Sequence, residues 1–166
     1  QNINYSVLGN SFIPIPPIPE QNKIVMINHL RYLDIGKYSS VLLVLARIMM
    51  GFLYISSGIP KLLAFSSTVD KMSDLGLMLP SITAAAVVVI EVIGAIMIIT
   101  GFFTRVTSLI LCLYTIAASI IGHAFWSMPD ALAHDNMIHF YKNICISGGF
   151  LTLAILGPGS ISFDKR

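Results

Sequence analysis

The arrangement of apolar and polar positions divides most of the chain into four long apolar stretches separated by short polar segments. A helix of roughly 20 apolar residues crosses a hydrocarbon core of ~30 Å. The pattern therefore predicts an all-α polytopic membrane protein, with four transmembrane helices in an antiparallel bundle. The predicted spans cover about residues 40–59, 80–100, 104–125 and 136–156. Pro60 should end the first of these helices, because proline cannot continue a helix comfortably.

A shorter apolar pattern lies between the first two stretches. Phe65, Val69 and Met72 recur at helical spacing, with polar residues on the rest of the wheel, and Gly76 fits a helix stop. We expect a short amphipathic helix over about residues 67–76, lying at the membrane interface. An ordinary loop is the alternative.

Residues 1–37 differ from the body of the chain at residues 38–166. Four prolines within positions 14–19 favour an extended polyproline conformation. Alone, such a segment does not bury enough surface to offset an ordering cost of ~1–2 kcal/mol per residue. We therefore expect this proline-rich tail to lie along another protein chain. Its main apolar contacts there should be Phe12, Ile13, Ile15 and Ile18.

Composition supports a membrane protein and excludes a nucleic-acid partner. The chain is 55% hydrophobic and 11% charged, whereas an average soluble domain carries roughly 25% charged residues. The net charge of +2 is too small to favour nucleic acid. Lysine and arginine number six on the side of the two termini and three on the other side. This bias predicts that both termini face the cytoplasm.

Two ionisable residues lie inside the predicted spans, where an unpaired charge costs on the order of 3 kcal/mol. Arg47 shares a helix face with Gly51 and Gly58, and Glu91 shares one with Gly94. Glycines at these spacings let helix backbones approach closely. We therefore expect Arg47 and Glu91 to form an intramembrane ion pair. The pair is interpreted as a structural lock on helix register or as a proton- or headgroup-handling pair in a polar cavity.

A second polar cluster lies toward the opposite membrane face from the termini. Polar side chains end the first and third spans there and begin the fourth, where they share one helix face. They are interpreted either as interfacial anchors or as a pocket that hydrogen-bonds a quinone carbonyl or binds an anion or lipid. The candidate pocket residues are Lys61, His123, His139, Lys142 and Asn143. Trp126 is expected to anchor the chain at the interface.

No spacing of histidine, cysteine or carboxylate residues predicts a metal site. Haem, flavin and iron–sulfur clusters likewise have no recognisable binding set here. A self-contained active site is therefore not expected, and a quinone is the candidate ligand.

The spaced motifs around these spans together resemble the DoxX family, over about residues 38–164. They are Arg47-x-x-x-Gly51, Gly58-x-x-Lys61-Leu62, Leu75-Gly76-Leu77, Glu91-x-x-Gly94, Gly101-Phe102-x-Thr104-Arg105, His123-x-Phe125-Trp126, Lys142-Asn143 with Gly148-Gly149, and Gly157-Pro158-Gly159-x-x-Ser162. The resemblance implies a four-helix protein of a bacterial or archaeal cytoplasmic membrane. Its relatives include the membrane subunit of an archaeal thiosulfate:quinone oxidoreductase.

The resemblance implies an integral subunit of a larger, quinone-linked redox complex in the membrane. Two alternatives remain. One is a non-catalytic structural or assembly subunit, and the other is a small transporter of an anion or proton.

Overall fold

The computed structural model describes residues 5–8, 11–14, 22, 25 and 36–165. The chain divides into two compact units, residues 1–37 and 38–166, which are described separately. The first unit contains the antiparallel strands β1 (Tyr5–Leu8) and β2 (Ser11–Pro14). The pairing of these strands was not predicted from the sequence, which indicated only an extended conformation for the tail.

The second unit is helical, which confirms the predicted all-α membrane fold. A short 3-10 turn η1 (Gly36–Tyr38) leads into α2 (Ser39–Leu63). The elements that follow are α3 (Phe65–Asp74), α4 (Pro80–Thr100), α5 (Thr104–Gly122), the 3-10 turn η2 (Phe125–Ser127) and α6 (Asp130–Leu156). Helix α3 confirms the predicted short helix and excludes the loop. Its place at the membrane interface stays a prediction.

The first helix does not end at Pro60, so that predicted boundary is wrong. Helix α2 continues through Pro60 to Leu63. A proline removes one backbone donor, and the last turn still closes, because Ala64 N donates to Pro60 O at 2.9 Å. The proline therefore lies inside the final turn of α2 and does not stop the helix.

Among the described residues, three segments are long and apolar enough to cross a membrane: Gly36–Leu63, Pro80–Thr100 and Thr104–Ser127. The fourth predicted span lies within α6. That helix starts earlier than expected, at Asp130, and its first half carries polar side chains up to Asn143. Its length of 27 residues corresponds to about 40 Å. A membrane crossing by α6 therefore stays a prediction.

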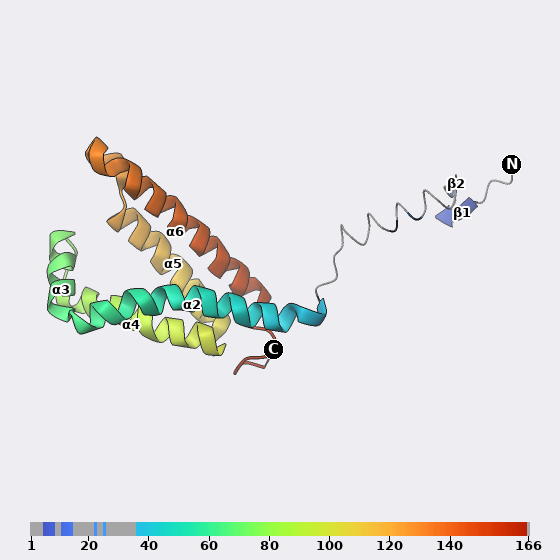
Figure 1. Cartoon of the computed structure of the whole chain (residues 1–166), viewed down its shortest axis with the longest axis horizontal. Helices are drawn as coiled ribbons and strands as arrows, with labels where there is room; N and C mark the ends of the chain where they lie inside the picture. The colour runs from blue at the N-terminus through green and yellow to red at the C-terminus, as the bar shows by residue number, and fades with distance from the viewer. Residues whose placement is uncertain (1–4, 9–10, 15–21, 23–24, 26–35, 166) are drawn as a thin grey trace. The chain divides into compact units, whose positions relative to one another are not determined.

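The helices of the second unit pack as two pairs. Helix α2 lies along α4, and α5 lies along α6 (Figure 1). Close approach of α2 and α4 depends on glycine: a Cβ at Gly58 would lie 2.8 Å from Val92 Cγ2 and 2.9 Å from Glu91 Cβ. Two turns earlier on α2, a Cβ at Gly51 would lie 3.1 Å from Ala95 O. The predicted glycine face of α2 therefore does pack on α4, whereas Gly94 of α4 faces Leu111 of α5.

The two helix pairs are held together at the turn between α4 and α5. Gly101 adopts φ +73°, and the Arg47 side chain packs directly on it. The C-terminal segment folds back over this turn: the Asp164 carboxylate accepts from Phe103 N and Thr104 N, both at 2.9 Å, and thereby caps α5. Arg105 Nη1 donates to two carbonyls at the end of α6. We call this region the closed end.

Candidate ligand-binding cavity

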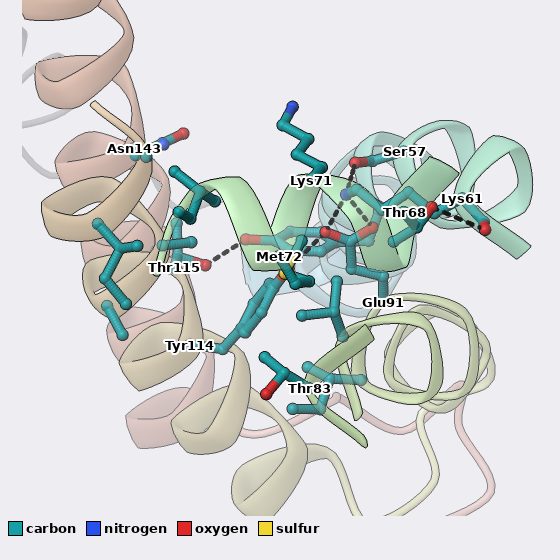
Figure 2. Close-up of a pocket in the computed structure, with 18 of the residues that line it drawn as sticks. Ser57, Lys61, Thr68, Lys71, Met72, Thr83, Glu91, Tyr114, Thr115 and Asn143 are labelled. Atoms are coloured by element: carbon teal, nitrogen blue, oxygen red, sulfur yellow. Dashed lines mark hydrogen bonds and ion pairs between the residues drawn. The ribbon is translucent and has the colours of Figure 1, made fainter. Parts of the chain in front are cut away.

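A cavity of about 730 Å³ lies at the other end of the second unit, between the two helix pairs. Helices α2, α3 and α4 line one side and α5 and α6 the other (Figure 2). Thr68 links α3 to the end of α2 by hydrogen bonds: its hydroxyl donates to Lys61 O at 3.0 Å and Ala64 O at 3.1 Å. Apolar side chains form most of the wall, and the polar groups gather in two places.

The first polar group is an ion pair inside the helical body. Lys61 Nζ lies 2.6 Å from both carboxylate oxygens of Glu91 and donates to Ser57 Oγ at 2.7 Å. Helical side chains point toward the N-terminus of their own helix, so Lys61 reaches back from the last turn of α2 to Ser57 and Glu91. The Lys61 side chain is 28% exposed and that of Glu91 5%.

Tyr114 completes this group from α5, and the sequence analysis missed it. Its hydroxyl donates to Glu91 Oε1 at 2.5 Å (Figure 2). The Tyr54 hydroxyl forms a second contact between the helix pairs, with Thr115 Oγ1. A tyrosine buried in a span usually finds a hydrogen-bond partner. The position of Tyr114 inside a predicted span therefore indicated from the sequence that its hydroxyl would contact a polar residue.

The predicted Arg47–Glu91 pair is wrong. Arg47 Nη2 instead donates to Ile161 O at 2.5 Å, at the closed end. The antiparallel register explains the error, because Gly58 faces Glu91 and Arg47 faces Gly101. Gly101, the C-cap of α4, lies ten positions after Glu91, which is about 15 Å along the helix axis. The two charges therefore belong to different ends of the bundle.

The second polar group lies on α5 and α6. The rings of His123 and His139 stack with centroids 5.1 Å apart. Lys142 Nζ lies 3.1 Å from His139 Nδ1, and His123 Nδ1 lies 2.9 Å from Asn136 Oδ1. Asn143 lies on the cavity wall opposite the ion pair (Figure 2).

The five candidate pocket residues thus come together. Lys61, His123, His139, Lys142 and Asn143 all line this one cavity. Two further residues were not predicted from the sequence: Tyr114, which bonds to Glu91, and Asn136, which bonds to His123.

The remaining predicted site residues lie elsewhere. Trp126, in η2, is 59% exposed and packs edge-on against Phe140 with ring centroids 5.6 Å apart. Phe12 and Ile13 belong to β2, and Ile15 and Ile18 lie outside the described residues. Partner docking by these tail residues stays a prediction. Within the described ranges, no group of three metal-ligating side chains is positioned to hold an ion.

This arrangement defines the class of the protein: a helical membrane protein with an internal cavity that has both apolar and polar walls. The sequence model of the DoxX family matches residues 42–124. The chain belongs to the DoxX family.

Curated relatives agree with this membership. Inner membrane protein YphA of Escherichia coli K12 is 45% identical over 139 residues, which cover 84% of this chain and 99% of that protein. Inner membrane protein YqjF of the same organism is 34% identical over 129 residues, covering 78% and 94%. A Surfeit locus protein 4 homolog of Drosophila melanogaster is 29% identical over 88 residues, covering 48% and 31%. No solved structure matches the chain significantly.

Proposed function

We propose that the 730 Å³ cavity binds a membrane-dissolved amphipathic molecule with hydrogen-bond-accepting oxygens, most simply a quinone. In this proposal the protein is the quinone-binding membrane subunit of a larger redox complex in a bacterial inner membrane. The observation that supports it is the joining of an apolar cavity with two polar groups on facing walls. Ligand pockets of ~300–1,000 Å³ typically combine apolar walls with a few placed polar groups.

The apolar walls suit a ring and its hydrocarbon substituent. Leu53 and Ile90 contribute from α2 and α4, and Ile146 contributes from α6. A polar head that leaves water needs a hydrogen-bond partner inside the cavity. The polar groups of the cavity supply such partners.

The ion pair and the polar residues of the α5–α6 wall have different roles in this proposal. An ammonium group has three donors, and the three bonds of Lys61 go to Ser57 Oγ and the two Glu91 oxygens. All three donors of the Lys61 ammonium group are thus used within the protein, and the ion pair forms one wall of the cavity with no net charge. His123 bonds Asn136 through Nδ1, which directs its Nε2 to other partners. The ligand oxygens are therefore received on the α5–α6 wall, by His123 and Asn143.

Electrons must come from a partner, because the sequence predicts no bound redox centre. The proline-rich tail is the segment through which we propose that the chain docks on that partner. The resulting assignment is a subunit that holds the quinone while another subunit reduces or oxidises it.

The chain contains a single tryptophan, Trp126, close in sequence to His123, and quenching of its fluorescence tests the binding step. A short-chain quinone titrated into the detergent-solubilised protein should quench Trp126 saturably. Asn143→Leu should raise the dissociation constant about 2- to 12-fold, the equivalent of one hydrogen bond of ~0.5–1.5 kcal/mol. Thr152→Val, at an exposed position on the same helix, is the matched control. Quenching that does not saturate, or that is equal in both variants, contradicts the proposal.

A structural or assembly subunit is the second candidate. The observation that favours it is the internal saturation of Lys61, since a fully satisfied ion pair can serve to fix helix register alone. Purification in a gentle detergent, with mass spectrometry of bound proteins and quinones, distinguishes the two. A scaffold brings partner proteins without quinone, whereas a quinone-site subunit brings both.

A further inference from the structure

Arg47 at the closed end is a buried cation whose hydrogen bonds are incomplete. The residue is 1% exposed, and Nη2 donates to Ile161 O. Within the described part of the chain, Nε and Nη1 are buried and have no hydrogen-bond partner. Guanidinium is always charged and offers a planar fork of donors. Two unused donors on a buried cation therefore indicate that a binding partner belongs at this position.

Asp164 does not accept a hydrogen bond from the two unused donor nitrogens of Arg47. Asp164 interacts electrostatically with Arg47, but its two carboxylate oxygens accept from Phe103 N and Thr104 N. An unsatisfied hydrogen-bond donor on a buried charged group costs more free energy than an unsatisfied donor on a buried neutral group. An additional anion would accept hydrogen bonds from the donor nitrogens of Arg47 that have no partner.

The structure provides space for such an anion. A second cavity of about 400 Å³ is lined by Arg47, Thr100, Ser162 and Lys165, together with apolar residues of α2, α4 and the C-terminal segment. Lys165 is exposed and adds a second cation. The geometry points to a phosphate site, because arginine binds phosphate through two parallel N–H donors.

We propose that this cavity holds the phosphate of an acidic membrane phospholipid. Phe163 and Ile161, which line it, are 72% and 54% exposed. Large apolar side chains beside a buried cation suit the junction of a headgroup and its acyl chains, whereas free phosphate gains nothing from them. Basic pockets between membrane helices are known to take acidic lipid headgroups. This site is separate from the quinone cavity and does not depend on it.

Thermal unfolding of the full chain in a neutral detergent tests the site. Phosphatidylglycerol, phosphatidylcholine and inorganic phosphate are added in separate titrations, and each variant is compared with its own lipid-free midpoint. Phosphatidylglycerol should raise the midpoint temperature of unfolding of the wild-type protein saturably. Phosphatidylcholine and inorganic phosphate at the same concentrations should not raise it. Arg47→Gln and Lys165→Gln should each raise the half-saturating lipid concentration about tenfold. Lys71→Gln, an equal charge change on α3, should leave it unchanged.

Arg47→Gln alone is open to the objection that the variant misfolds. Lys165→Gln removes this objection, because the side chain is exposed and its loss leaves the helix packing intact. Equal midpoint shifts with phosphatidylcholine, or with inorganic phosphate alone, contradict an acidic-lipid site. So does a phosphatidylglycerol response that survives both substitutions.

Discussion

Replacement of Lys61 by methionine tests the ion pair that forms one wall of the cavity. The substitution keeps the unbranched apolar stem of the side chain, is one heavy atom shorter, and removes the charge. Glu91 then keeps its bond from Tyr114 but loses the cation 2.6 Å away. The Glu91 side chain is 5% exposed, so bulk water solvates the unpaired carboxylate poorly. We expect the free energy of unfolding to fall.

The expected loss is about 3 kcal/mol. Removing one partner of a buried pair typically costs ~3–5 kcal/mol, because the survivor is left uncompensated. Lys61 keeps 28% exposure, which places the expected cost at the lower end of that range. Lys61→Met combined with Glu91→Gln should recover most of the loss, since no buried charge then remains unpaired.

The assay is unfolding of the four members of this cycle in mixed micelles, titrated with a denaturing detergent and followed by near-UV circular dichroism. A second cycle uses Arg47→Met with Glu91→Gln as the matched control. A coupling energy of about 2 kcal/mol is expected for Lys61 with Glu91, and about zero for Arg47 with Glu91 because the two are not partners. A large coupling in the second cycle, or none in the first, refutes the register described above.

Four further predictions follow, two from the contacts of the helices and two from the sequence. Gly58→Leu should destabilise the protein by at least ~2 kcal/mol in the same unfolding assay, because its side chain would collide with α4; an unchanged midpoint would contradict the close packing. Tyr114→Phe should cost about 1–2 kcal/mol through loss of its bond to Glu91, and a neutral effect would count against that bond. Single cysteines at Ser73 and Ser162 should react with an impermeant thiol reagent from opposite sides of the membrane, and labelling from one side would end the four-span topology. Deletion of residues 1–20 should release the protein from the proposed partner without loss of the helical body, as measured by co-purification; full retention of the partner would exclude docking by the tail.

The sequence pattern was sufficient to predict the helices and the meeting of particular faces. The apolar periodicity indicated the helices, and the glycines at 51 and 58 indicated the face of α2 that packs on α4. The polar residues of α5 and α6 also lie in one cavity, as the shared helix face suggested. These features depend on local spacing, which is visible in a single sequence.

The pairing of charges depended on register, which local spacing does not determine. Arg47 and Glu91 both lie inside apolar stretches on glycine-bearing helix faces, but neither feature determines the register between the two helices. The partner of Glu91 is instead Lys61, which lies at the end of its helix and reaches back one turn. A long flexible side chain moves its charge by a full turn, so its position in sequence is a poor guide to the depth of its ammonium group.

The closed end could not be read from the sequence for a related reason. Asp164 caps α5 across 60 residues of chain, and Ile161 O accepts from Arg47 across 114. Such long-range contacts of a short polar segment carry no periodic signal. The family motifs in this region, at Gly101 and Gly157, nevertheless correspond to positive φ values that glycine adopts without strain.

The most direct test of the cavity as a quinone site is covalent mapping with a photoreactive quinone analogue in lipid nanodiscs. Peptide mass spectrometry then identifies the labelled residues. We expect labelling within residues 114–123 and 139–146, and loss of that labelling when excess unreactive quinone is present. Labelling that is spread over lipid-facing positions such as Val89 and Leu113, and that excess quinone does not reduce, would contradict this expectation.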